Sequence, residues 1–128
     1  MEILIADDEV HARRILQMSL EKAGYSVRVA QNGQDALEQF RQKMPDVLIT
    51  DIMMPKMTGE QLCKQLLVEY PGLPIPVFVL TSRAEREHRE WVLKMPRGNF
   101  VEKPVSIKQL LKSLSELKPE SAPAPGGE

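Results

Sequence analysis

The segment DVLIT at residues 46–50 contains an uninterrupted apolar run, and Asp51 follows it directly. A strand with apolar side chains on both faces is typical of a parallel sheet that helices cover on both sides. The segment PVFVL at residues 76–80 has the same character, and EILIA at residues 2–6 is also predicted to be a strand. These runs together favour a parallel sheet as the centre of the fold.

Two more segments, SVRVA at residues 26–30 and NFVE at residues 99–102, complete five predicted strands. Stretches of helical periodicity follow the strands, and the first of them covers residues 9–23, with Gly24 suited to end it. Capping boxes predict the starts of three later helices, in the pairs Thr58–Gln61, Ser82–Glu85 and Ser106–Gln109. Five strands alternating with five helices predict an α/β fold with a doubly wound parallel sheet.

Composition places the chain among globular proteins of one domain. Its 128 residues are 42% hydrophobic, which is enough for a core, and its formal net charge of −1 gives no reason to expect nucleic acid or an anionic membrane as a partner. A single cysteine and the lack of a long apolar run favour a cytoplasmic location. Residues 1–117 form the predicted domain, and residues 118–128, rich in Pro, Ala and Gly, are predicted to be a flexible tail or linker.

Polar side chains follow the predicted strands at the points where the strands end. Asp7 and Asp8 come after the first strand, Asp51 after the third, Thr81 after the fourth and Lys103 after the fifth. The carboxyl ends of parallel strands meet at one edge of a doubly wound sheet, where such folds bind their ligands. We therefore expect three carboxylates, a hydroxyl group and an ammonium group on one small patch.

This set of groups suits phosphoryl chemistry. Three adjacent carboxylates alone would repel one another and bind protons, whereas a hard divalent cation would neutralise them. Mg²⁺ prefers oxygen ligands and usually keeps some water molecules. An ammonium and a hydroxyl group beside such a metal suit a phosphoryl group, and carboxylates are known phosphate acceptors. The residues themselves thus indicate a Mg²⁺-assisted phosphoryl site with an aspartate as the acceptor.

Several motifs occur in an order that resembles one protein family. They are ADDE (6–9), NGQDAL (32–37), PDVLITDIMMPKMTGEQL (45–62), VLTS (79–82) and FVEKP (100–104). In these motifs the chain is similar to the receiver domains of bacterial two-component response regulators, over about residues 1–117. The resemblance implies a flavodoxin-like (βα)5 fold with a five-stranded sheet in the order 2-1-3-4-5.

The resemblance also implies the residues of the phosphorylation site. Asp51 would accept a phosphoryl group from a phosphohistidine. Asp7 and Asp8, the latter more directly, would bind Mg²⁺, for which Mn²⁺ can substitute. Asp51 itself and the backbone carbonyl of Met53 would be further metal ligands. Lys103 would pair with the phosphoryl oxygens.

Three further positions match residues that the family uses to respond to phosphorylation. The resemblance implies a cis peptide bond between Lys103 and Pro104, a Thr81 hydroxyl that moves toward the phosphoryl group, and a Phe100 ring that turns inward with it. From the sequence alone, Phe100 suits a fixed core position equally well. The movement would change a surface made by the predicted helix 4 (residues 83–94), strand 5 (residues 99–102) and helix 5, which follows Ser106.

The implied partners follow from this chemistry. A sensor histidine kinase or a histidine phosphotransfer protein would donate the phosphoryl group. The surface of helix 4, strand 5 and helix 5 would contact an output partner and is a candidate homodimer interface. No direct contact with nucleic acid or a membrane is expected. The chain would be a signalling receiver that catalyses only its own phosphorylation and dephosphorylation.

Other functions fit parts of the pattern. A pseudo-receiver, an interaction module that is never phosphorylated, would share the fold, although the intact acidic residues argue against it. A Mg²⁺-dependent phosphatase with an aspartyl nucleophile typically has a second aspartate two residues after the first, where this chain has Met53. Nucleotide binding is disfavoured because no glycine-rich loop follows the first strand.

Overall fold

The computed structural model describes residues 1–82 and 90–117. Within these residues, the strands are β1 (Glu2–Ala6), β2 (Ser26–Ala30), β3 (Val47–Asp51), β4 (Val77–Thr81) and β5 (Gly98–Glu102). The helices are α1 (Val10–Lys22), α2 (Gly33–Gln42), α3 (Gly59–Glu69), α4 (Glu90–Leu93) and α5 (Ile107–Ser115). The predicted alternation of strands and helices is confirmed.

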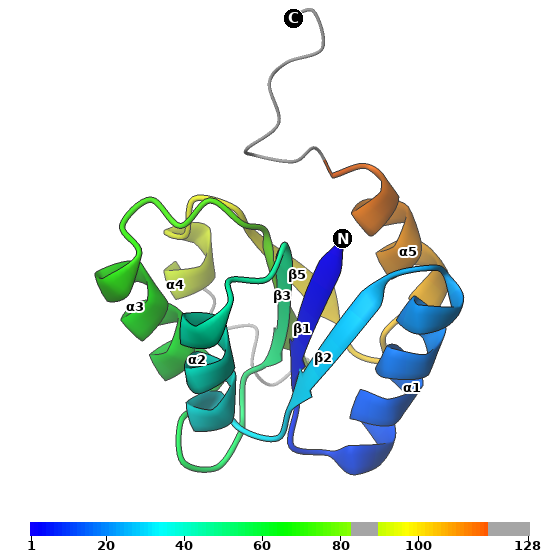
Figure 1. Ribbon diagram of the computed structural model, residues 1–128, viewed down its shortest axis with the longest axis horizontal. Coiled ribbons are helices and arrows are strands. Elements are labelled where there is room, and N and C mark those ends of the chain that lie inside the picture. The colour runs from blue at the N-terminus through cyan, green and yellow to red at the C-terminus, as the bar shows by residue number, and fades with distance from the viewer. Residues whose placement is uncertain (83–89, 118–128) are drawn as a thin grey trace, which may run out of the picture.

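The strands form one parallel sheet in the order β2-β1-β3-β4-β5, the order that the family resemblance implied. Helices α1 and α5 cover one face of the sheet, and α2, α3 and α4 cover the other (Figure 1). Since all strands run in the same direction, their carboxyl ends share one edge, which is the lower edge in Figure 1. The doubly wound α/β fold is confirmed.

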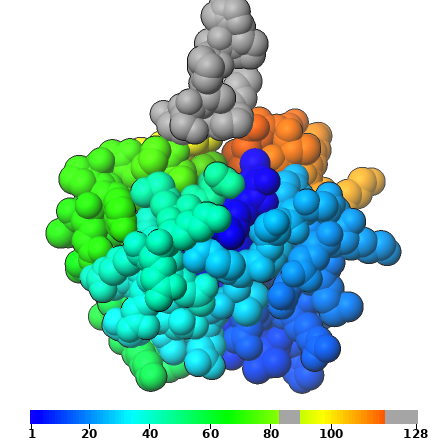
Figure 2. All heavy atoms as spheres, viewed as in Figure 1, coloured from blue at the N-terminus to red at the C-terminus, as the bar shows by residue number. Residues whose placement is uncertain are grey.

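Two apolar cores flank the sheet, one on each face. Every residue of β3 and β4 is buried. In β1, Leu4 packs in the core with α2 and α3, whereas Ile3 and Ile5 pack with α1 and α5. Successive side chains of a strand point to opposite faces, which explains this alternation. In the space-filling view, the start of the chain shows as a dark blue area beneath the grey atoms, between teal and light blue surfaces (Figure 2).

Two of the three predicted capping boxes lie within the described residues. Thr58 and Gln61 form the predicted capping box at the start of α3. At the start of α5, Ser106 Oγ accepts a hydrogen bond of 3.3 Å from the Gln109 N–H. The third predicted box, at Ser82, includes a residue outside the described part of the chain.

Helix α1 is one residue shorter at each end than the predicted span of 9–23. The carboxylate of Glu9 caps its first turn by accepting hydrogen bonds of 3.0 and 2.9 Å from the N–H groups of His11 and Ala12. Gly24 follows the helix with a φ of 100°. This left-handed conformation favours glycine and explains the residue at that position.

Strands β3 and β4 each lie one residue later than predicted. Asp51 still pairs with Leu80, and Thr81 still pairs with Glu102, so both polar residues belong to the ends of their strands. Each of these side chains is therefore held by regular sheet structure, which fixes its direction better than a loop would.

The predicted helix over residues 83–94 is described only as α4, which ends before Pro96 and buries Trp91. The predicted tail at residues 118–128 lies outside the described residues. Within residues 1–82 and 90–117, no helix has the length and apolar character needed to cross a bilayer.

Candidate functional site

Four strands bring the predicted site residues to one edge of the sheet. Asp7 directly follows β1, Asp51 ends β3, Thr81 ends β4 and Lys103 directly follows β5. Asp51 pairs with Leu80 in the sheet, next to Thr81. The backbone N–H of Lys103 donates a hydrogen bond of 2.8 Å to the Thr81 carbonyl. The residues predicted from the strand ends therefore lie on adjacent strands, as expected.

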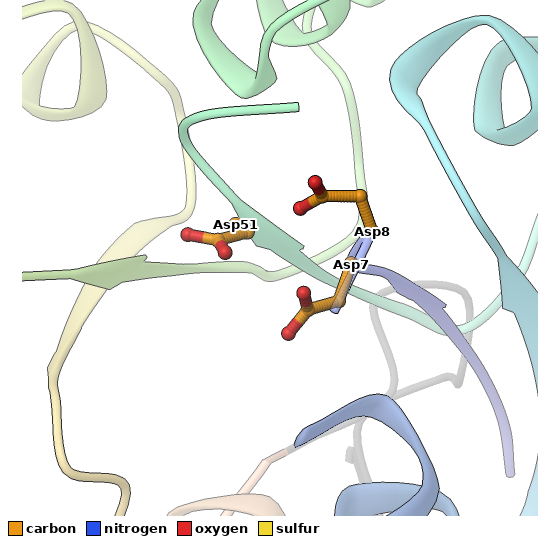
Figure 3. A group of neighbouring side chains, drawn as sticks. All are labelled: Asp7, Asp8 and Asp51. Atoms are coloured by element: carbon orange, nitrogen blue, oxygen red, sulfur yellow. The ribbon is translucent and has the colours of Figure 1, made fainter. Parts of the chain in front are cut away.

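Three carboxylates gather at this edge. One oxygen from each of Asp7, Asp8 and Asp51 lies within 4.8 Å of the corresponding oxygens of the other two. Figure 3 shows the three side chains grouped there, with the carboxylates of Asp7 and Asp8 directed toward the side on which Asp51 lies. Asp7 and Asp51 are buried, with exposed fractions of 1% and 6%, and Asp8 is exposed. The cluster is thus embedded on one side and open to solvent on the other.

Asp7 is held at three points. Its N–H donates to the Ala30 carbonyl over 3.1 Å, and its Oδ1 accepts a hydrogen bond of 2.9 Å from the Glu9 N–H. Its carbonyl accepts a hydrogen bond of 2.9 Å from Arg13 Nη1. Burial raises the pKa of Asp7 above its usual value; the Glu9 N–H opposes this, and the negative charge of Asp51 adds to it. An anionic Asp7 is therefore costly unless a cation is close.

Asp51 has a cationic partner. Lys103 Nζ lies 2.8 Å from Asp51 Oδ1, which also accepts a hydrogen bond of 2.8 Å from the Ile52 N–H. The Thr50 hydroxyl donates to the Asp51 carbonyl over 2.8 Å. A Cβ at position 59 would lie only 2.1 Å from that carbonyl oxygen, which explains the glycine there. Asp51 is therefore fixed in both its main chain and its carboxylate.

The loop between β3 and α3 is fastened at both ends. Gly59 N–H donates to the Ile52 carbonyl over 2.7 Å, and Gly33 N–H, at the start of α2, donates to the Met57 carbonyl over 3.1 Å. A Cβ at position 33 would lie 2.2 Å from the Met57 oxygen. Met53, inside this loop, has an exposed fraction of 63%. An exposed Met53 side chain is consistent with the family resemblance, in which the backbone carbonyl at this position, and not the side chain, would bind the metal.

The remaining predicted residues lie along β4 and β5. Thr81 is 2% exposed. Phe100 is half-buried and packs against the core shared with α2, α3 and α4. The peptide bond between Lys103 and Pro104 is cis, as the resemblance implied.

The donor set fits a hard divalent cation. All three acidic side chains offer oxygen, the ligand atom that Mg²⁺ prefers. Two oxygens bound to one Mg²⁺ lie at most about 4.2 Å apart, so the side chains need only small adjustments to share an ion. The exposed side at Asp8 leaves room for the water molecules that Mg²⁺ usually keeps.

Arg13 is a contact that no sequence pattern singled out. Its side chain reaches back from α1 to the backbone of Asp7, six residues earlier. Side chains on a helix point toward its N-terminus. An arginine in the first turns of a helix that follows an acidic pair could therefore have been predicted to reach back to that pair.

Comparison with known proteins finds one family over most of the chain. The family model for the response regulator receiver domain matches residues 3–115. A probable transcriptional regulator, ycf27, of Guillardia theta is 38% identical over 109 residues, covering 85% of this chain and 42% of that protein. Response regulator MprA of Mycobacterium leprae is 36% identical over 126 residues, covering 95% of this chain and 54% of that protein. The chain thus spans about half the length of these curated relatives.

Solved structures share the fold over most of the chain. The chemotaxis response regulator CheY4 of Vibrio cholerae has a TM-score of 0.80 at 29% identity, covering 89% of this chain and 95% of that one. A putative response regulator from Chloroflexus aurantiacus has a TM-score of 0.80 at 28% identity, covering 89% and 93%.

Proposed function

The chain belongs to the response regulator receiver domain family, and from this premise we propose that Asp51 accepts a phosphoryl group from a phosphohistidine donor. The observation that carries the proposal is the contact of 2.8 Å between Lys103 Nζ and Asp51 Oδ1, beside two further carboxylates. This is the charge distribution that phosphoryl transfer needs, with an anionic acceptor, a fixed ammonium group and a set of oxygen ligands for a cation.

In the proposed reaction, a carboxylate oxygen of Asp51 forms a bond to phosphorus while the bond from phosphorus to the donor's imidazole nitrogen breaks. The nitrogen keeps the electron pair. The ammonium group of Lys103 would contact the oxygens of the transferred phosphoryl group and offset part of their negative charge. The hydroxyl of Thr81 donates a hydrogen bond to the new acyl phosphate. The chain would catalyse only its own phosphorylation and the later hydrolysis.

Asp7, Asp8 and Asp51 would hold Mg²⁺ together with the backbone carbonyl of Met53, and Mn²⁺ can substitute. When bound, the metal supplies positive charge to the transferring phosphoryl group. Support comes from the oxygen set of the three carboxylates and from the burial of Asp7, since a buried carboxylate is stabilised by a nearby cation.

We assign the response to phosphorylation to Thr81 and Phe100. Phe100 and Thr81 lie on adjacent strands, because Phe100 pairs with Val79 and Thr81 with Glu102. A hollow of about 460 Å³ runs along β5 and α5, and its lining includes Phe100, Lys103 and Gln109. A change at Asp51 would reach Lys103, which contacts it over 2.8 Å and directly follows β5, so a partner bound on the face of α4, β5 and α5, or a second copy of the chain, would sense the change.

The donor is proposed to dock on α1. The helix starts directly after the acidic pair and exposes three apolar side chains, Val10 at 55%, Ile15 at 59% and Met18 at 61%. An apolar patch beside a reactive group suits a protein donor such as a histidine kinase or a phosphotransfer protein. A Met18→Asp variant should accept phosphate more slowly from a protein donor and at the wild-type rate from a small one. Equal slowing with both donors would contradict docking at this helix.

The phosphoacceptor is tested by incubating the chain with Mg²⁺ and phosphoramidate and measuring the intact mass. We expect the wild type to gain one phosphoryl group and Asp51→Asn to gain none. Asp46→Asn is the matched control, because Asp46 is an exposed aspartate at the opposite edge of the sheet, and it should be labelled like the wild type. A wild type without any mass gain would favour an interaction module that is never phosphorylated.

The family places the chain in two-component signalling, and a cytoplasmic location is part of this proposal. Since the relatives named as regulators are about twice as long, we attribute to this chain only the receiver step. Its effect on a target would pass through protein contacts.

A further inference from the structure

We propose that Arg13 is a positioning residue for the acidic pair: its guanidinium fixes the peptide unit that joins Asp7 to Asp8 and thereby strengthens Mg²⁺ binding. The inference rests on the proposed function, because it concerns the same metal site. It adds a residue outside the acidic and basic groups already assigned there.

The geometry of α1 brings Arg13 to this position. The N–H of Arg13 donates to the Glu9 carbonyl over 3.0 Å, so Arg13 lies one turn after the helix start. Helical side chains lean toward the N-terminus, which directs the guanidinium back to the end of β1. There Arg13 Nη1 lies 2.9 Å from the Asp7 carbonyl oxygen. The next residue, Arg14, is turned away by about 100° and is exposed.

The bonded carbonyl belongs to the peptide unit that connects the two acids. A peptide unit is planar, so fixing the direction of the Asp7 carbonyl also fixes the Asp8 nitrogen and restrains the Asp8 Cα. Asp7 has other restraints, at its own N–H and at its carboxylate. Asp8 is exposed, so packing does little to orient it. The orientation of Asp8 relative to Asp7 therefore depends strongly on the Arg13 contact.

The choice of acceptor atom matters. A guanidinium bound to a carboxylate would compete with a metal for its oxygens, as an ion pair does. Arg13 instead donates to a main-chain carbonyl, so its charge lies near the acidic cluster while the carboxylate oxygens of Asp7 and Asp8 stay available. Lys103 differs, because its ammonium group contacts the acceptor carboxylate of Asp51 directly.

The test is a Mg²⁺ titration of purified chain by calorimetry, with melting temperatures measured with and without saturating Mg²⁺. In Arg13→Met, which keeps the aliphatic stem without donors, we expect Mg²⁺ affinity to fall about 10-fold, the lower end for losing a partner that orients a ligand. Arg14→Met is the matched control and should bind within about twofold of the wild type. Arg13→Lys, which restores one donor, should lie between the two.

A purely structural role would lower the melting temperature equally with and without Mg²⁺, whereas a positioning role reduces the increase that Mg²⁺ produces. Folded Arg13→Met with wild-type affinity would overturn the inference, as would an equal loss in Arg14→Met. Arg13→Gln, a good helix former with a side chain too short to reach, is expected to bind like Arg13→Met and replaces it if that variant does not fold. A wild type that binds no Mg²⁺ would overturn the metal site itself and this inference with it.

Discussion

At the amino end of the sheet, charged groups are matched in number, whereas at the carboxyl end they are not. Arg28 Nη2 lies 3.3 Å and Lys43 Nζ 3.8 Å from Glu2 Oε1, and Asp46 Oδ2 accepts a hydrogen bond of 2.7 Å from the Glu2 N–H. This amino-end cluster, defined by those four residues, has two carboxylates and two cations. The carboxyl-end cluster, defined as Asp7, Asp8, Asp51 and Lys103, has three carboxylates and one cation. The nearby Arg13 contacts a main-chain carbonyl and is not counted in it.

The two clusters also differ in what their hydrogen bonds connect. Arg28 donates to the Gln39 and Lys43 carbonyls over 3.1 and 2.6 Å, and so fastens the end of α2 to the sheet. The carboxyl-end groups are oriented by main-chain contacts but keep oxygen atoms directed at one another. In the amino-end cluster the opposite charges offset one another, so the cluster stabilises the fold without a ligand. The carboxyl-end cluster has excess negative charge, so a bound cation would stabilise it, and this is where we expect a ligand.

The largest expected effect removes an acid from the unmatched cluster. Asp8→Asn should lower Mg²⁺ affinity at least about 100-fold, beyond the range for residues that only orient a ligand. Asp46→Asn, in the matched cluster, should leave the affinity unchanged. Calorimetric titration of both variants measures the difference. Equal affinities in the two variants would show that the clusters do not differ in the way described.

The next effect removes a cation from the matched cluster. Arg28→Met should lower the free energy of unfolding by about 2–4 kcal/mol, because it removes the nearer cation of the partly buried Glu2 carboxylate and a hydrogen-bond donor to each of two carbonyls. Urea unfolding with and without Mg²⁺ measures it, and the stabilisation by Mg²⁺ should stay as in the wild type. Lys43→Met, whose side chain is 73% exposed, serves as the control and should change little.

A smaller effect comes from neutralising Asp7. The pKa of this carboxyl is raised in the folded chain, chiefly by burial, so the folded state holds the proton more tightly than the unfolded state. The corresponding stability is present below the ordinary value of 3.8 and is lost as the pH rises through the raised pKa. Without Mg²⁺, Asp7→Asn should therefore melt a few degrees above the wild type at neutral pH. This increase in melting temperature should vanish below pH 3.8. In saturating Mg²⁺ the variant should melt below the wild type, because it loses stabilisation by the bound metal. A variant less stable at neutral pH without metal would contradict this account.

The smallest effect is expected far from both clusters. Arg41 Nε donates to Glu69 Oε1 over 2.8 Å, and this ion pair lowers the pKa of Glu69 to about 2. Its stability contribution is therefore complete above 4.5 and is lost as the pH falls through about 2. Because the pair is exposed, Glu69→Gln should lower the melting temperature only slightly at neutral pH and not at all in strong acid. A large loss at neutral pH would mean that surface pairing matters more here than either cluster.

The sequence predicted the fold, and it predicted that the candidate site residues lie together at one edge of the sheet, because both depend on regular patterns. Asp51, Thr81 and Lys103 stand at strand ends, and parallel strands bring their ends together whatever the detailed packing. Arg13 and Arg28 could not be predicted in the same way. Both donate to main-chain carbonyls, which have no sequence signature, and an arginine on a helix or an edge strand is usually solvated. The reach of each side chain depends on where its element starts and on what packs beside it.

The contact between Gly33 and the Met57 carbonyl has a consequence for how the chain tolerates change. A Cβ at position 33 would lie 2.2 Å from that oxygen, so any other residue would displace the segment that follows Asp51. In a library of random substitutions selected for phosphorylation, position 33 should accept almost nothing but glycine, although it carries no functional group. Neighbouring Gln34, which is only half-buried on the same helix, should accept many residues.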